Sequence, residues 1–162
     1  MVEWGQPMHA YDYDHVKGHS LTARLAKEGE VLKTLDGTDR VLTESMLIIA
    51  DAERPVGVAG VMGGFDSEVT KETTNILFEA AVFDGASIRR TARALGMRSE
   101  ASGRFERGVN PAFTHIALDR AVSLLAEIAE GVEIAADYID VYPTPVEHKM
   151  ITFVPEEVTR FL

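Results

Sequence analysis

The chain has 162 residues, of which 46% are hydrophobic and 26% are charged, and it contains no cysteine. These values exclude intrinsic disorder, a disulfide scaffold and a thiol nucleophile, and no apolar run approaches the ~20 residues of a membrane-spanning helix. Because the amino terminus has neither a basic start nor an apolar signal region, we expect a cytoplasmic protein with no membrane association. The formal net charge is -10, but residues 89–107 hold six arginines and two glutamates, a local charge of +4, so we expect any contact with RNA to occupy a small patch.

Short strands are predicted along the first half of the chain, because apolar residues occur there in brief or alternating runs. The Asp36-Gly37 dipeptide separates two of these runs and predicts a hairpin turn. The runs at 46–50 and 56–62 are almost continuously apolar, which is typical of strands that are buried on both faces. The predicted strands cover residues 21–25, 31–35, 40–42, 46–50, 56–62 and 75–82.

Two helices are predicted in the second half. Residues 87–95 form the shorter one, which Gly96 ends. Pro111 opens the longer one, whose apolar residues recur on one face until Gly131 stops the helix. Residues 132–141 are then predicted to form a further strand. These elements together predict an α/β chain of the mixed α+β kind, with mixed strands, one long helix and one shorter helix.

The end of the sequence predicts a change of domain. Residues 1–141 are expected to form the main domain, whereas residues 142–149 contain two prolines and little apolar material and are expected to form a linker. Residues 151–153 and 155–162 predict a strand and the start of a helix that have no core of their own. We therefore expect residues 150–162 to begin another domain.

Three histidines and two aspartates near the amino terminus form a composition that can ligate a divalent metal. They are His9, Asp12, Asp14, His15 and His19. A polar segment rich in turn residues collects such side chains without any metal, so a polar surface loop is the favoured interpretation and a metal site is the alternative.

Two other patterns match known motifs only loosely. The glycines at 57, 60, 63 and 64 lack both the Gly-Lys-Ser/Thr ending of a phosphate loop and the G-x-G-x-x-G spacing, so tight strand packing is favoured over nucleotide binding. Ser99 lies outside any G-x-S-x-G motif, which argues against a serine nucleophile.

Glu79 is the one charged residue in the apolar run at 75–82. A carboxylate buried among apolar side chains must find hydrogen bonds or lose its charge. One interpretation places Glu79 on an edge strand facing water, and the other makes it an acceptor in a pocket that receives a donor from a ligand. The arginines at 89, 90 and 93 are typical of the solvated face of a helix.

Five stretches of the sequence resemble a known family. They are GQPMHAYD (5–12), LKTLDG (32–37), RPVGVAGVMGGFDSEVT (54–70), NILFEAAVF (75–83) and IRRTARALGMRSEASGRFERGVNP (88–111). In this order and spacing they are similar to the B3/B4 module of the bacterial phenylalanyl-tRNA synthetase β chain, and the resemblance covers nearly all of residues 5–143. The last twelve residues, ITFVPEEVTRFL, resemble the opening of the next module, B5. Because the family's module starts before GQPMHAYD, we expect the N-terminal part of B3 to be missing from this chain.

The resemblance implies a fragment of phenylalanine-tRNA ligase that edits, by hydrolysing the ester of tyrosine wrongly attached to tRNA(Phe). Its implied partners are the α chain, in an α2β2 enzyme, and the acceptor end of tRNA(Phe). The whole synthetase would use ATP and Mg²⁺, whereas no cofactor and no metal is implied for this fragment. The alternative is an architectural module of the same synthetase that catalyses nothing.

The resemblance also assigns roles in recognition of the tyrosyl group. Glu79 would accept a hydrogen bond from the phenol, helped by the backbone at Gly63, and would reject phenylalanine because its carboxylate would then stay unpaired. Ser99 and Ala101 correspond to small residues in the pocket wall. Ser99 stands where threonine is commoner in the family, and the lost methyl group is expected to widen the pocket slightly.

Pro7 and His9 correspond to the wall near the scissile ester. The resemblance is compatible with attack by water without a covalent intermediate, in which positioning makes the main contribution. His9 would act as a general base or would orient the ribose of the terminal adenosine, and the sequence leaves both roles open.

Overall fold

The computed structural model describes residues 1–146 and 150–161, and the chain divides into two units, Met1–Val132 and Glu133–Leu162. The first unit contains the sheets and the candidate site. The second unit contains one helix in its described part, α4 (Pro155–Phe161).

The strand predicted over 132–141 is wrong, and so is the strand predicted over 151–153, because neither stretch has regular secondary structure. The side chain of Ile139, for example, is 93% exposed. An apolar run becomes a strand only when a neighbouring strand takes up its backbone hydrogen bonds, and none of the described residues does so here.

The helix predicted from residue 155 onward is confirmed by α4. Residues 147–149 of the predicted linker, and Leu162, lie outside the described residues.

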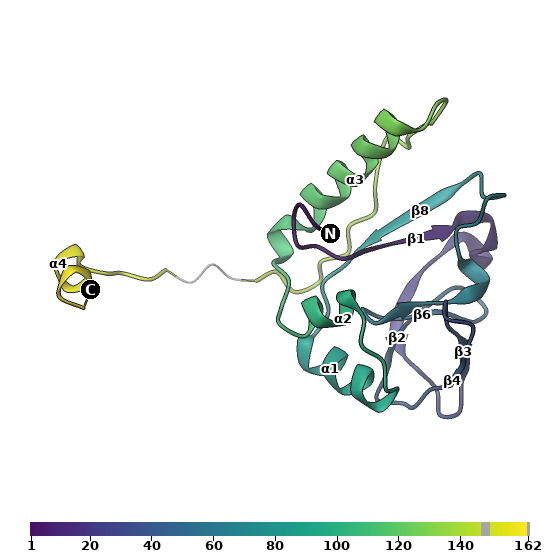
Figure 1. Ribbon diagram of the computed structural model, residues 1–162, viewed down its shortest axis with the longest axis horizontal. Coiled ribbons are helices and arrows are strands. Elements are labelled where there is room, and N and C mark those ends of the chain that lie inside the picture. The colour runs from purple at the N-terminus through teal and green to yellow at the C-terminus, as the bar shows by residue number, and fades with distance from the viewer. Residues whose placement is uncertain (147–149, 162) are drawn as a thin grey trace. The chain divides into compact units, whose positions relative to one another are not determined.

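The described strands of the first unit form three antiparallel sheets (Figure 1). A four-stranded sheet has the order β2-β5-β6-β7, and β1 pairs with β8 and β3 with β4 in two separate ribbons. The strands are β1 (Met8–Asp12), β2 (Thr22–Leu25), β3 (Val31–Lys33), β4 (Asp39–Val41), β5 (Leu47–Ala50), β6 (Pro55–Val58), β7 (Met62–Gly63) and β8 (Ile76–Ala80). The predicted hairpin is confirmed, since β3 and β4 are joined at Asp36-Gly37 and Gly37 has φ +77°.

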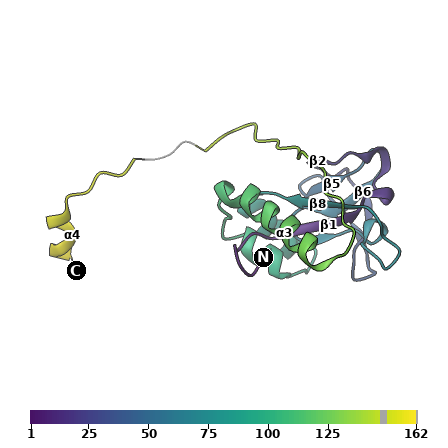
Figure 2. The ribbon, with the colours of Figure 1, turned by 90° about the horizontal axis from the view of Figure 1, so that it is seen from above.

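Three helices follow β8 in the first unit. They are α1 (Gly85–Ala94), α2 (Glu100–Phe105) and α3 (Thr114–Ile128), and short 3-10 turns lie at Tyr13–His15, Lys17–His19, Phe65–Ser67 and Pro111–Phe113. The predicted helices correspond to α1 and α3, whereas α2 was not predicted from the sequence. Figures 1 and 2 show α3 lying along β8, against which it packs.

The core lies on both faces of β5 and β6, which confirms that these two strands are buried on both sides. The single strand predicted over 56–62 is wrong, because the chain turns at residues 59–61, where Gly60 has φ +66°, and continues as β7. On one face, the core cluster includes Ile48, Val58, Ile88 of α1 and Phe105 of α2. On the other face, it includes Ile49, Val56, Val16 and Tyr11 of β1. The four-stranded sheet is therefore the central layer, with α1 and α2 packed on one side and the β1–β8 ribbon on the other. Burial of each large aliphatic side chain in these two interfaces stabilises the folded state by about 1.5–3 kcal/mol. The fold is thus the mixed α+β class that the sequence predicted.

Candidate functional site

The β1–β8 ribbon brings together residues that are far apart in the sequence. Its register places His9 opposite Glu79 and Tyr11 opposite Leu77. Directly opposed residues, and residues two positions apart on one strand, point to the same face of a ribbon. His9, Tyr11 and Glu79 therefore share the face that is turned toward β6 and β7, and we call these three residues the ribbon cluster.

A short hydrogen bond joins two members of the ribbon cluster. The phenol Oη of Tyr11, a residue only 1% exposed, donates to Glu79 Oε2 at 2.5 Å. Burial raises the pKa of the Glu79 carboxyl, and the bond from Tyr11 partly opposes that rise. Burial and the nearby Glu79 charge raise the pKa of Tyr11 well above its usual range, so Tyr11 stays a hydrogen-bond donor. Glu79 thus lies half-buried with a phenol bound to one of its oxygens.

His9 lies beside this pair. Its ring meets the Tyr11 ring edge-on, with centroids 4.5 Å apart. Its Nε2 is buried and has no hydrogen-bond partner among the described residues, and burial lowers the pKa of the imidazole, which is therefore neutral near pH 7. A neutral histidine nitrogen without a partner is available to accept a proton or a hydrogen bond.

Gly63 adjoins His9 from β7. A Cβ at position 63 would overlap the His9 ring, so only glycine allows the backbone and the imidazole to approach this closely. Gly64, the next residue, would place a Cβ against the backbone of Val56. The glycine pair is thus explained by close packing of β7 against β6 and β1, as the sequence analysis favoured.

Ser99 and Ala101 lie on a different element, α2. Ser99 is the N-cap of α2: its Oγ accepts from Ser102 N at 3.1 Å, and Ser102 Oγ accepts from Ser99 N at 3.0 Å. Ser99 Oγ also donates to the carbonyl oxygen of Val61 at 2.7 Å, and Val61 lies two residues before Gly63 in the chain. Ala101 is half-buried and packs against the core cluster. The link from α2 to the ribbon cluster therefore runs through the backbone of residues 61–63.

Gln6 and Pro7 precede β1. Pro7 was predicted from the sequence as a site residue, whereas Gln6 was not. Pro7 is buried, and its carbonyl accepts from Gln6 Nε2 at 2.9 Å. The same Gln6 nitrogen donates to Ala81 O at 2.8 Å and so joins the start of β1 to the end of β8. Gln6 is fully buried, yet its Oε1 has no partner among the described residues. Tyr11 was missed as well, because the strand that positions it was not predicted.

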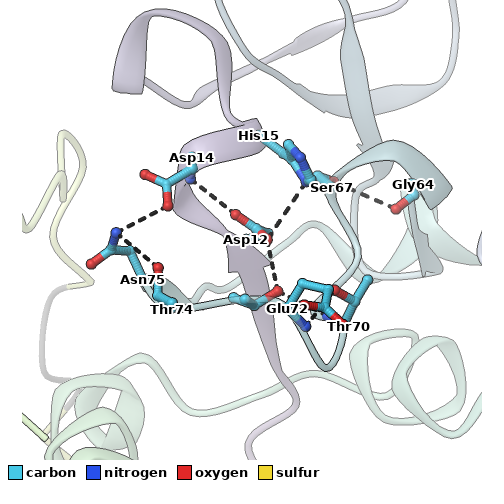
Figure 3. A network of polar contacts seen from close by, with 10 residues as sticks. Asp12, Asp14, His15, Gly64, Ser67, Thr70, Glu72, Thr74 and Asn75 are labelled. Atoms are coloured by element: carbon cyan, nitrogen blue, oxygen red, sulfur yellow. Dashed lines mark hydrogen bonds and ion pairs between the residues drawn. The ribbon is translucent and has the colours of Figure 1, made fainter.

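A polar network fixes the opposite end of the ribbon (Figure 3). The buried Asp12 accepts from Asp14 N at 3.0 Å and from Thr73 Oγ1 at 2.6 Å, and the bond from Thr73 is the main reason why the pKa of Asp12 is lowered. Asp14 accepts from Asn75 Nδ2 at 3.0 Å. His15 Nδ1 lies 3.6 Å from Asp12 Oδ2. These contacts attach the residues after β1 to the loop before β8.

The five residues weighed as metal ligands thus have different environments. His9 and Asp12 are in β1 and at least half-buried, so the surface-loop interpretation is wrong for them, whereas His15 and His19 are exposed in 3-10 turns as expected. The interpretation failed because β1 pairs with a strand more than sixty positions later, which local composition does not reveal. Among the described residues, no group of three or more His, Asp or Glu side chains is gathered to hold a metal ion.

The fold and the ribbon cluster together define a mixed α+β domain that presents a half-buried carboxylate, a phenol and a neutral imidazole on one face of a two-stranded ribbon. Residues 1–130 match the family model described as "B3/4 domain". The chain therefore belongs to the B3/4 domain family, as the resemblance of its motifs indicated.

Three proteins similar to this chain are all named phenylalanine–tRNA ligase β subunit. The chain is 56% identical over 162 residues to the phenylalanine–tRNA ligase β subunit of Moorella thermoacetica, 51% over 153 residues to that of Geobacter sulfurreducens and 43% over 162 residues to that of Bacillus cereus. These alignments cover 94–100% of this chain but only 19–20% of the relatives, so the chain spans about a fifth of their length. No helix in the described part of the chain is long and apolar enough to cross a membrane.

Proposed function

We propose that this chain is the editing part of a phenylalanine–tRNA ligase β subunit and that it hydrolyses Tyr-tRNA(Phe). Two findings support the proposal: the family membership with its relatives, and above all the bond between the Glu79 carboxylate and the Tyr11 phenol. An apolar pocket for phenylalanine cannot strongly exclude a substrate that differs only by a hydroxyl, so sorting requires a second site with a dedicated hydrogen-bond acceptor. The cluster holds an acceptor of that kind.

Glu79 would recognise the phenol of the misattached tyrosine. A carboxylate has about four lone-pair positions, and the bond from Tyr11 uses one of them on Oε2. The substrate phenol would take another position, while Tyr11 acts as a positioning residue that holds the carboxylate in place. Phenylalanine would offer no donor to this position, so the carboxylate would keep only the bond from Tyr11 and the bound state would lack one hydrogen bond to a charged acceptor, a difference of about 1.5–3 kcal/mol.

Hydrolysis would proceed by attack of water on the ester carbonyl, with no covalent intermediate. The neutral His9 would act through its unpartnered Nε2, either as a general base that takes a proton from the water or as an acceptor that orients the ribose hydroxyl. Pro7 would lie in the wall near the ester, and Ser99 and Ala101 in the wall around the ring. The step uses no metal or cofactor from this chain, whereas the whole synthetase would require ATP and Mg²⁺.

The partners follow from the same proposal. Because the relatives are named β subunits, the full-length protein would assemble with an α subunit, as α2β2, and would receive the acceptor end of tRNA(Phe). The net charge of -10 agrees with delivery of the RNA by other parts of the enzyme, because this chain has only a small basic region.

A second candidate function is an architectural module of the same synthetase. The observation that favours it is the structural use of the residues assigned to the pocket wall: Ser99 caps α2 and Ala101 packs against the core. In this alternative the module would hold neighbouring domains and would catalyse nothing.

The deciding experiment compares the hydrolysis of Tyr-tRNA(Phe) and Phe-tRNA(Phe) by the full-length β subunit assembled with its α subunit. Glu79→Ala removes the acceptor and should reduce the preference for Tyr-tRNA(Phe) by about 1.5–3 kcal/mol, or roughly 10-fold to 100-fold. Glu44→Ala is the matched control, because Glu44 is exposed and lies outside the ribbon cluster. An unchanged preference in Glu79→Ala, or an intact wild-type enzyme that hydrolyses neither substrate, would contradict the editing function and favour the architectural one.

A further inference from the structure

Two adjoining cavities lie beside α2, apart from the ribbon cluster. The larger has a volume of about 480 Å³ and is lined by Arg98, Arg104 and Arg107 together with Ser99, Glu100 and Gly103. The smaller, of about 290 Å³, also has Arg104 and Arg107 in its wall, and on its other side it reaches Trp4, Gln6 and Phe113. Because two arginines line both, the cavities are neighbours, one cationic and one partly aromatic.

The three arginines of the larger cavity have no carboxylate partner within the described part of the chain, whereas Arg24, Arg40, Arg54 and Arg120 each form an ion pair. The buried Nε of Arg104 has no hydrogen-bond partner among the described residues. A buried donor without an acceptor is costly, so the arrangement is suited to a ligand that supplies anionic oxygens. Glu100 is the single carboxylate in the wall, which leaves an excess of positive charge. A guanidinium group can donate two parallel hydrogen bonds to two oxygens of one phosphate group, so phosphate is the anion that best matches these arginines.

The smaller cavity offers the complementary contacts of a nucleoside. Trp4 and Phe113 are 42% and 41% exposed, and their rings are 5.9 Å apart between centroids at an interplanar angle of 40°. Exposed aromatic rings next to a cationic groove are the usual platform for unstacked bases of single-stranded RNA. Gln6 Oε1 is a buried acceptor without a described partner, and a ribose hydroxyl or a base amino group is the donor that would satisfy it.

The position of this site suits RNA that also reaches the ribbon cluster. Gln6 precedes His9 by three residues, so their Cα atoms are at most about 11 Å apart even in a fully extended chain. A short stretch of single-stranded RNA spans that distance. We propose that the two cavities bind one nucleotide of the RNA acceptor end next to the aminoacylated terminus, with its phosphate on Arg98, Arg104 and Arg107 and its base and ribose against Trp4, Phe113 and Gln6. This inference rests on the proposed editing function for its substrate.

The test uses the full-length protein assembled with its α subunit and a double variant, Arg98→Gln with Arg107→Gln. Both arginines are exposed, so the substitutions preserve the core. The matched control is Arg89→Gln with Arg93→Gln, which removes the same charge from exposed positions of α1 that line neither cavity. The first readout is binding of a labelled single-stranded RNA oligonucleotide by fluorescence anisotropy at several salt concentrations. The second is hydrolysis of Tyr-tRNA(Phe) and of tyrosyl-adenosine, which has no phosphate.

The double variant at positions 98 and 107 should bind the oligonucleotide about 10-fold or more weakly, with a shallower salt dependence, whereas the control should bind like the wild type. Its KM for Tyr-tRNA(Phe) should rise while kcat and the hydrolysis of tyrosyl-adenosine stay unchanged. Equal effects of the two double variants would overturn the inference, and so would competition by inorganic phosphate alone as effective as competition by the oligonucleotide. If Tyr-tRNA(Phe) is hydrolysed equally well with and without the cavity arginines, the proposed nucleotide site is refuted and the editing function stands. RNA binding that depends on these arginines in a protein without hydrolysis refutes the editing function instead.

Discussion

Replacing Tyr11 by phenylalanine would remove a single hydroxyl from the ribbon cluster and leave the packing of the ring intact. Tyr11 is almost completely buried, and its hydroxyl donates to Glu79 Oε2 at 2.5 Å. The substitution therefore isolates the contribution of one hydrogen bond to a carboxylate that has little access to water.

The expected loss depends on pH. A hydrogen bond to a charged group contributes about 1.5–3 kcal/mol, whereas one between neutral groups contributes about 0.5–1.5 kcal/mol. Burial raises the pKa of folded Glu79 above its ordinary value, so Glu79 favours folding when it is protonated, and this contribution is lost as the pH rises through the raised pKa. The bond from Tyr11 lowers that pKa, so in Tyr11→Phe the pKa rises further. The difference in stability between wild type and variant should therefore be smallest at acid pH and should grow as the pH rises through the pKa of Glu79.

Urea unfolding of the chain over a range of pH that spans the pKa of Glu79 would measure this difference. The control is Tyr13→Phe, because Tyr13 stacks on His19 and its hydroxyl has no hydrogen bond among the described residues. We expect the Tyr11 variant to lose about 1.5–3 kcal/mol where Glu79 is ionised and about 1 kcal/mol where Glu79 is protonated, and the control to change little at any pH. A loss that is independent of pH, or one as small as the control's, would refute the assignment of the bond to an ionised Glu79.

Two further substitutions test the packing around the site. Gly63→Ala places a Cβ on the His9 ring, so it should lower the free energy of unfolding by about 1–3 kcal/mol and reduce the hydrolysis of Tyr-tRNA(Phe). The control is Gly103→Ala, whose Cβ would meet nothing within 4 Å and which should leave hydrolysis intact and stability unchanged or raised. Equal losses of stability and hydrolysis in the two variants would contradict the close contact between Gly63 and His9. Ala101→Trp should lower the melting temperature, because overpacking at the core costs about 1–3 kcal/mol. It should also abolish the hydrolysis of Tyr-tRNA(Phe) while the full enzyme still aminoacylates tRNA. A parallel loss of hydrolysis and aminoacylation would favour the architectural role.

The elements that the sequence predicted correctly have local signals. The hairpin at Asp36-Gly37 requires a residue with positive φ at Gly37, and β5 and β6 carry uninterrupted apolar runs. The helix α1 begins at an aspartate N-cap and ends before Gly96, which has φ +63°. In each case the information lies within ten or so residues of the element that it specifies.

Two elements had no such signal. The strand β1 alternates polar and apolar residues only weakly, and its pairing partner is β8, so nothing near it in the sequence indicates a strand. The helix α2 has only six residues and contains Gly103, and the third residue after its Ser99 N-cap is Ser102 instead of the glutamate or glutamine of the usual capping box. Both missed elements carry residues of the candidate site.

The site itself depends on register, which explains why the residues alone could not predict it. Glu79 was recognised as unusual because it interrupts an apolar run, but its neighbours His9 and Tyr11 come from a strand nearly seventy positions earlier. Only the resemblance to a known family connected His9 with Glu79, and it assigned no role to Tyr11. A shift of β1 by one residue relative to β8 would turn His9 and Tyr11 to the face opposite Glu79.

That register is held from both ends of the ribbon. A two-stranded ribbon is only marginally stable by itself, so its alignment needs contacts beyond the ladder. At one end Gln6 donates to Ala81 O, and at the other Asp12 accepts from Thr73 in the loop before β8. Neither contact belongs to the ribbon cluster, yet each fixes one strand relative to the other. The position of the Glu79 carboxylate is therefore set by buried polar side chains at the two ends of the ribbon, which is why a short and otherwise weak element can hold the groups that this site requires.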